Sequence, residues 1–197
     1  MKNVIFVHGI SGLHTEKFLS SLEQKCKELG LAFYAPSLGS YKDEITYNGW
    51  KKYFDENILS HINSETIFIS HSLGTQFAVK YFVERDLHVG LYISLAGCKD
   101  VFKIKQSSPS GFFKLAPISR QFKPTEEEFN KFKKINFEKI AMYSDDDPIF
   151  EQWNLEGYAL STGASSVKVH GKGHFSVEKI DELEELIKGL FQKNRGL

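Results

Sequence analysis

Short apolar runs alternate with amphipathic stretches along most of the chain. Apolar positions at three- and four-residue spacing predict helices, for example over 18–29 and 50–62, and Gly30 stands where a left-handed helix cap is wanted. Six apolar runs are too short for helices and predict strands: residues 4–7, 31–34, 66–69, 91–95, 140–143 and 166–169. Because strands that alternate with helices form parallel sheets covered on both faces, the pattern predicts an α/β fold, a three-layer α/β/α sandwich.

The alternation breaks between residues 99 and 134. Residues 107–111, Pro117 and Pro124 have the composition of loops. Thr125 and Glu128 have the spacing of a capping box, which predicts that a helix begins there. We expect a single domain over residues 1–197, with residues 99–134 as an insertion that is either a small lid or a surface excursion packed on the main core.

Composition and charge narrow the class of protein. Lys plus Arg and Asp plus Glu both number 25 and are intermixed, so we expect a small-molecule substrate rather than nucleic acid or an anionic membrane. Cys26 and Cys98 are the only cysteines; they form neither a disulfide framework nor a metal set, which favours a reducing cytoplasm. The first apolar run is too short for a signal peptide or a membrane span.

A motif of small residues follows the third predicted strand. The apolar run 66–69 leads into S-H-S-L-G at residues 70–74, and a helical pattern comes next. A strand, a sharp turn and a helix around such a motif form a nucleophile elbow, with Ser72 at the tip of the turn. Gly74 fits the close packing of this turn, whereas Ser70 stands where glycine is more usual. The motif alone is also typical of an ordinary strand-to-helix turn, so its context decides.

Polar residues follow three other predicted strands. In parallel sheets the ligand site lies beyond the carboxyl ends of the strands. This edge should carry the turn 8–12 after the first strand, Asp147 after the fifth and His174 after the sixth. The order Ser72, Asp147, His174 is that of a triad in which the imidazole takes the serine proton and the carboxylate orients the imidazole. We predict that these three side chains meet as a catalytic triad.

Neighbouring residues offer alternatives for two members of this triad. His174 follows glycines that let its ring fold back toward the serine, whereas His170 ends a strand that fixes the direction of its ring. Asp147 precedes a proline and is also suited to cap a helix, and Asp145 is the reserve choice for the acid. With Asp146 these acids could instead hold a metal ion, but neither a glycine-spaced ligand loop nor a histidine pair accompanies them.

Acyl transfer also requires two backbone N–H donors that bind the oxyanion. On such a sheet they come from the residue after the nucleophile and from the turn after the first strand, here Leu73 and Ile10. Gly9 and Gly12 in the same turn could suggest a dinucleotide-binding loop, but the G-x-G-x-x-G spacing is missing.

These residues resemble the α/β-hydrolase superfamily, and more narrowly the compact serine hydrolases that include the retinoblastoma-binding serine hydrolase and its bacterial relatives. The resemblance covers nearly the whole chain and rests on the turn 8–12, the segment 71–74, Asp147-Pro148 and the segment 173–175 (G-H-F). It implies a parallel sheet of about six strands in the order 2-1-3-4-5-6, with a small insertion after the fourth strand. It also implies Asp147 and His174 as triad members. Ser70 and a longer insertion depart from the family pattern.

The combined prediction is a carboxylesterase-like serine hydrolase that cleaves an ester, thioester or small amide through an acyl-enzyme on Ser72, without a cofactor. The alternative is a non-enzymatic binding protein on the same fold. A carboxylate-nucleophile relative is disfavoured by Ser72, and acyl transfer to an alcohol or amine stays open because it shares the first half of the reaction. Candidates for substrate contact, of which the aromatic ones are also typical of a core, are His8, Phe112, Phe113, Phe150 and Trp153.

Overall fold

The computed structural model describes residues 1–43, 45–108 and 115–195. Its strands are β1 (Asn3–Val7), β2 (Ala32–Tyr34), β3 (Thr66–His71), β4 (Leu91–Leu95), β5 (Glu138–Ser144) and β6 (Ser165–Val169). Its helices are η1 (Leu13–Thr15), α1 (Leu19–Glu28), α2 (Tyr47–Asn57), η2 (Leu59–His61), α3 (Leu73–Arg85), α4 (Ala116–Phe122), α5 (Glu126–Lys134), α6 (Gln152–Thr162) and α7 (Asp181–Arg195). Within these ranges, no helix combines the length and the apolar character that a bilayer span requires.

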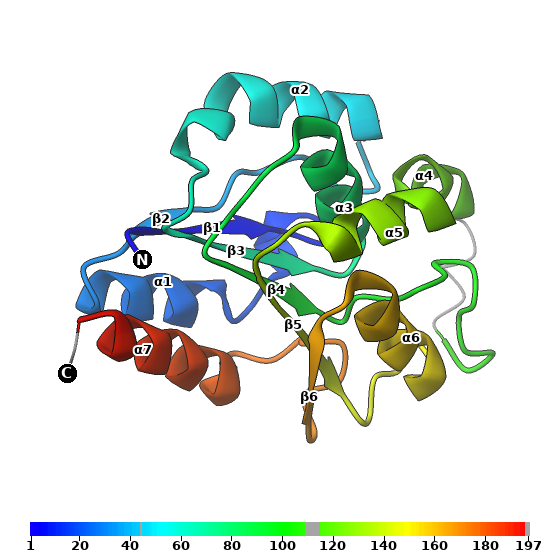
Figure 1. Ribbon diagram of the computed structural model, residues 1–197. Coiled ribbons are helices and arrows are strands. Elements are labelled where there is room, and N and C mark those ends of the chain that lie inside the picture. The colour runs from blue at the N-terminus through cyan, green and yellow to red at the C-terminus, as the bar shows by residue number, and fades with distance from the viewer. Residues whose placement is uncertain (44, 109–114, 196–197) are drawn as a thin grey trace.

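The strands form one parallel sheet in the order β2-β1-β3-β4-β5-β6, which confirms the predicted architecture and strand order (Figure 1). Strand β1 lies between β2 and β3, so the direction of strand addition reverses at β1. Its register with β3 runs from Asn3 opposite Thr66 to Val7 opposite Ser70. The turn after β1 therefore lies beside the end of β3, at the place where ligands bind to sheets of this kind.

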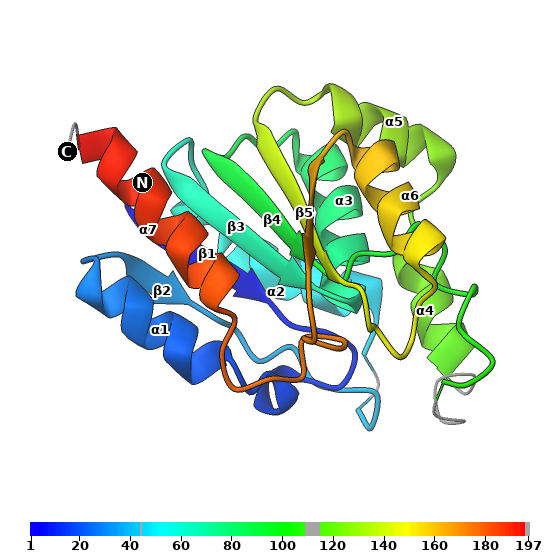
Figure 2. The ribbon, with the colours of Figure 1, turned by 90° about the horizontal axis from the view of Figure 1, so that it is seen from below.

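Two helical layers cover the sheet. Helices α1 and α7 lie on one face, and α2, α3, α4, α5 and α6 lie on the other (Figures 1 and 2). Because successive strand residues point to opposite faces, Val4 and Phe6 of β1 pack in the α1/α7 core, whereas Ile5 and Val7 pack in the opposite core. Both faces of β1 are fully buried, as its continuous apolar run predicts.

Helix ends follow local signals, with one difference from the prediction. Gly30 follows α1 with a φ of 70°, the left-handed conformation predicted for it. The helix predicted over 50–62 begins earlier, after the N-cap Thr46, and its α-helical part ends at Asn57. Ile58 is the C-cap, with a φ of −118°, and η2 follows. The apolar spacing continues through this change because Ile58 and Ile62 still pack on the same core.

The insertion contains helices as well as loops. Pro117, assigned to a loop by its composition, lies in the first turn of α4, where the missing proline N–H is not needed by the helix. The predicted capping box of Thr125 and Glu128 begins α5. The lid role of residues 99–134 stays a prediction. The helical part of the insertion contributes three aromatic side chains to the main core: Phe122, Phe129 and Phe132.

Candidate active site

Ser72 lies at the tip of a strained turn between β3 and α3. Its φ and ψ of 51° and −116° are outside the regions that residues with a side chain usually adopt. Such a backbone costs about 1–3 kcal/mol and persists only where its surroundings hold it. Here the Ser72 N–H donates to the Leu95 carbonyl over 2.9 Å, and the Ser72 carbonyl accepts from the Thr75 N–H and hydroxyl over 3.0 and 2.7 Å. These bonds hold the serine hydroxyl at the carboxyl edge of the sheet.

Gly74 allows α3 to approach β1 closely behind this turn. A Cβ at this position would lie 2.6 Å from the carbonyl oxygen of Val7 and 2.7 Å from that of His8. A carbon atom and a carbonyl oxygen that are not bonded to each other do not approach so closely. A side chain at position 74 would therefore push the helix away from the strand.

Ser70, the departure from the usual glycine, is built into the structure below the turn. Its hydroxyl lies 2.8 Å from that of Tyr92, which lies 2.8 Å from that of Tyr158. Tyr158 in turn donates to the carbonyl oxygen of Thr75 over 3.2 Å. All four residues are fully buried. The buried hydroxyl of Ser70 therefore has a hydrogen-bond partner.

Three of the predicted site residues are hydrogen-bonded in a row. His174 Nε2 lies 2.9 Å from Ser72 Oγ, and His174 Nδ1 lies 2.7 Å from Asp147 Oδ2. Asp147 is 1% exposed and His174 is 8% exposed. Because the carboxylate accepts a hydrogen bond from the Nδ1–H group, the lone pair of Nε2 faces the serine hydroxyl. This arrangement lets the imidazole accept the serine proton while the carboxylate stabilises the resulting cation.

Asp147 uses its two carboxylate oxygens differently. Oδ2 contacts His174, whereas Oδ1 accepts hydrogen bonds from the N–H groups of Ile149 at 2.7 Å and Phe150 at 3.0 Å. The capping role and the histidine contact thus coexist in one side chain. Burial alone would raise the pKa of Asp147, but the charge and hydrogen bond of His174 and the two N–H donors hold this pKa below its ordinary value.

The neighbouring acids bind other parts of the same histidine loop. Asp145 Oδ2 lies 2.5 Å from Nδ1 of His170, whose side chain is 81% exposed. Asp146 Oδ1 accepts a hydrogen bond from the Gly173 N–H over 2.8 Å. Asp145 and His170, the two alternatives for acid and base, therefore pair with each other rather than with Ser72. In the described ranges, no group of three or more His, Cys, Asp or Glu side chains is placed to hold a metal ion.

Left-handed backbone turns the His174 loop toward Ser72. Gly171 and Gly173 have φ values of 67° and 55°, which glycine adopts without steric cost. Phe175 also has a positive φ, of 55°, and its side chain is fully buried in the α1/α7 core. The phenylalanine therefore anchors the loop on one side of His174 while the glycines supply its bend on the other.

The backbone N–H groups of Ile10 and Leu73 have no hydrogen-bond acceptor among the described residues. Both residues line a cavity together with Ser72. The neighbouring N–H of Gly9 is already engaged, since it donates to Glu16 Oε1 over 2.8 Å. The two predicted oxyanion donors are therefore unused and close to the serine.

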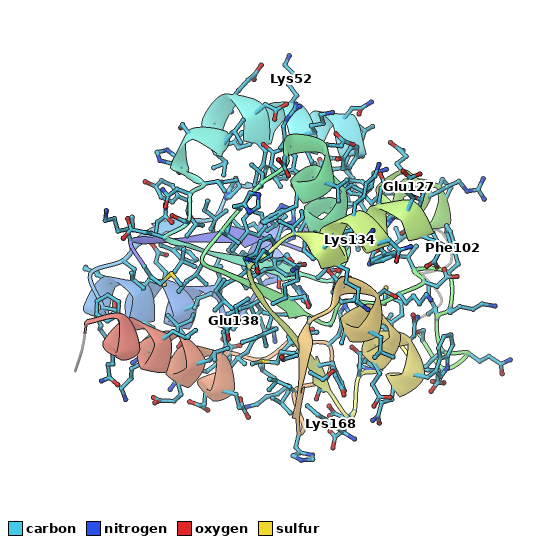
Figure 3. All side chains as sticks on the ribbon, in the orientation of Figure 1. Lys52, Phe102, Glu127, Lys134, Glu138 and Lys168 are labelled. Atoms are coloured by element: carbon cyan, nitrogen blue, oxygen red, sulfur yellow. The ribbon has the colours of Figure 1, made fainter. Side chains whose placement is uncertain are left out.

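Two cavities share Ser72. The first is mainly apolar and is lined on one side by Val101, Ile104 and Leu115 of the insertion and by Phe150. Phe102, labelled in Figure 3 and 38% exposed, also lines it. The second is more polar and is lined by His174, Pro148 and the residues of the turn after β1, among others.

The other candidates for substrate contact lie in different surroundings. Phe150 lines the apolar cavity, but Trp153 is 57% exposed and lines a separate surface hollow. His8 is fully buried; its Nδ1 donates to the Gly9 carbonyl over 2.7 Å and its Nε2 accepts from the Leu38 N–H over 2.9 Å. Phe112 and Phe113 lie outside the described residues.

The insertion also supports the loop that carries Asp147, which the sequence did not indicate. Ile104 forms an antiparallel bridge with Phe150, and the Lys105 N–H donates to the Ile149 carbonyl over 2.8 Å. The Lys105 ammonium donates to the Asp147 carbonyl over 2.7 Å. These residues come from an aperiodic stretch, and neither spacing nor composition marks them for the site.

Solved structures with low sequence identity share this fold. The ydeN gene product of B. subtilis is 15% identical with a TM-score of 0.77, over 98% of this chain and 100% of that one. The alpha/beta hydrolase domain-containing protein 10 from mouse is 16% identical with a TM-score of 0.68, over 97% and 90%. The carboxylesterase CesB of Bacillus subtilis is 12% identical with a TM-score of 0.60, over 94% and 82%. The fold is thus that of the α/β-hydrolases.

Comparison with curated protein sequences gives no match. Comparison with protein-family models does: residues 4–190 match the family described as serine hydrolase. This match includes β2 to β6, all of β1 except its first residue, the turn at Ser72 and the loops that carry Asp147 and His174. The chain therefore belongs to the serine hydrolase family.

Proposed function

We propose that this protein cleaves an ester, thioester or small amide through an acyl-enzyme on Ser72, with carboxylesterase-like specificity. The observation that carries the proposal is the hydrogen-bonded row Ser72–His174–Asp147, at 2.9 and 2.7 Å, beside two unused N–H donors. A carboxylesterase and a thioesterase domain among the proteins of the same fold support this reaction class.

In the proposed reaction, Ser72 Oγ attacks the acyl carbon as its proton passes to His174 Nε2. The negative oxygen that forms is bound by the N–H groups of Ile10 and Leu73, and Asp147 stabilises the imidazolium. Collapse of this intermediate breaks the bond to the leaving group, which receives the proton from His174. Water then attacks the acyl-enzyme with His174 as base, and collapse releases the acid and restores the serine.

A fluorophosphonate probe tests this proposal because it phosphorylates activated serines. We expect the wild-type protein to be labelled and Ser72→Ala to be unlabelled, with ester turnover lower by about a millionfold in the variant. Ser64→Ala, at an exposed serine, is the matched control and should label like the wild type. Absence of labelling on folded wild-type protein would overturn the proposal and favour the non-enzymatic alternative.

We further propose that the apolar cavity binds a short to medium acyl chain. Val101, Phe150 and Cys98 of its lining belong to a packed apolar cluster, and the insertion beside the cavity is too small to enclose a long chain. In a series of p-nitrophenyl esters, kcat/KM should be highest for the shorter chains and low for palmitate. Preference for the longest chain would contradict this assignment.

A cytoplasmic location stays a prediction. The two free, buried cysteines support it.

A further inference from the structure

A second buried acid–histidine pair includes the residue next to Ser72 in the chain, and the proposed reaction does not use it. Glu16, between η1 and α1, places Oε1 2.8 Å from Nδ1 of His71, the last residue of β3. Both side chains are buried, with exposed fractions of 3% and 8%. The His71 ring also lies next to that of His174, at a centroid distance of 5.1 Å.

Both ring nitrogens of His71 face hydrogen-bond acceptors. Nδ1 faces the Glu16 carboxylate, and Nε2 lies 3.0 Å from the backbone carbonyl oxygen of His174. A carbonyl oxygen and a carboxylate can only accept, and a neutral imidazole has a single N–H to donate. An imidazolium has two, so it satisfies both partners at once.

The surrounding groups favour a charged His71. The titratable groups around it are Glu16, Asp147, His8 and His174. Burial alone would lower the pKa of His71, but the charge and hydrogen bond of Glu16, the His174 carbonyl and the charge of Asp147 raise this pKa overall. Burial likewise opposes ionisation of Glu16, yet His71 and the Gly9 N–H lower its pKa.

The pair joins the three loops that carry the proposed chemistry. Glu16 Oε1 also accepts the Gly9 N–H over 2.8 Å and so holds the turn that presents the Ile10 N–H. His71 precedes Ser72 directly and binds the backbone of His174. We propose that Glu16 and a doubly protonated His71 form a buried ion pair that positions the oxyanion turn, the nucleophile and the general base. The pair's effect on catalysis rests on the proposed function.

The protonation of His71 can be measured without any activity. In full-length protein labelled with ¹⁵N at histidine, we expect both ring nitrogens of His71 to carry protons at pH 7. In Glu16→Gln one of them should lose its proton, because the amide oxygen can accept from Gly9 and His71 but supplies no charge to hold the second proton. An unprotonated Nδ1 in the wild type would overturn the proposal; it would place the proton on Glu16 instead.

Glu16→Gln should also slow the proposed reaction. Loss of one charge-assisted hydrogen bond corresponds to a decrease of about ten- to a hundredfold in kcat, with KM within about twofold, and the rate of fluorophosphonate labelling should fall in parallel. His170→Gln, in the exposed acid–histidine pair, is the matched control and should keep wild-type rates. A folded Glu16→Gln protein with wild-type kcat would contradict the positioning role. Should this variant fail to fold, the spectrum of the wild type still decides the protonation state.

Discussion

The carboxylate of Asp147 makes two sets of contacts, and these determine how the Asp147→Asn substitution should affect activity. In Asp147→Asn the amide oxygen can still accept from Ile149 and Phe150, but the amide nitrogen then faces His174 Nδ1. The imidazole must turn a lone pair toward it and carry its proton on Nε2, where it cannot take the serine proton. We expect kcat for ester hydrolysis to fall by about 10⁴-fold, with a wild-type circular dichroism spectrum.

Asp145→Asn is the control for this change, since Asp145 binds His170 and Gly171 at the surface. Its kcat should remain within about threefold of the wild type, as is usual for an exposed ion pair of small energetic value. A larger loss in Asp145→Asn than in Asp147→Asn would show that the acid has been assigned to the wrong aspartate.

Single residues differ in how far the sequence identifies them. Ser72, Asp147 and His174 could be placed together because each follows a strand, and parallel strands end at one edge. His71 occupies a position of the serine motif at which the motif specifies no residue type, so the sequence indicated no role for its side chain. Glu16 carries no comparable signal: it lies in an aperiodic connection, and its contacts to Gly9 and His71 exist only after the chain has folded.

At the scale of elements, the contact between α3 and β1 depends on Gly74. A methyl group there would meet two backbone carbonyl oxygens at 2.6 and 2.7 Å, and neither can move without separating the helix from the strand. We expect Gly74→Ala to lower the free energy of unfolding by about 3 kcal/mol and to abolish fluorophosphonate labelling. Urea unfolding followed by circular dichroism measures the first effect.

Gly189 offers the matched control because it lies in α7 with open space around its Cα. Gly189→Ala should raise the free energy of unfolding by about 0.5–1 kcal/mol, the difference in helix propensity, and should leave labelling unchanged. If Gly74→Ala were as stable as the wild type, the close approach of α3 to β1 would not be what requires glycine.

Elements with periodic apolar positions were predicted well, and those without were not. The strands and α1 follow from runs and spacing that reflect their burial. Helix α4 was missed because Pro117 has the composition of a loop until its position in the first turn of the helix is known. The end of α2 was placed too late because Ile58 and Ile62 continue the apolar spacing past the last α-helical residue. The strand order itself came from a family resemblance rather than from the pattern.

At the scale of the whole molecule, two buried histidines link stability to pH in opposite directions. Burial lowers the pKa of His8, whose Nε2 accepts a backbone N–H, so its contribution is present above the unfolded pKa and is lost as pH falls. The pKa of His71 is raised by Glu16 despite burial. Its contribution is therefore present below the unfolded pKa of about 6.5 and is lost as pH rises through the folded pKa.

The free energy of unfolding of the wild type should consequently decrease as pH rises from 6.5 to 8, because the unfolded chain releases the His71 proton at a lower pH than the folded protein does. Glu16→Gln removes the charge that raises this pKa, so the decrease should disappear in that variant. The window ends near pH 8 because burial raises the pKa of Cys26 to about 12, whereas an unfolded thiol has a pKa of about 8.5 and ionises above that window. Urea unfolding at half-unit steps of pH measures both proteins. Equal slopes for the two proteins in this window would show that Glu16 does not hold a proton on His71.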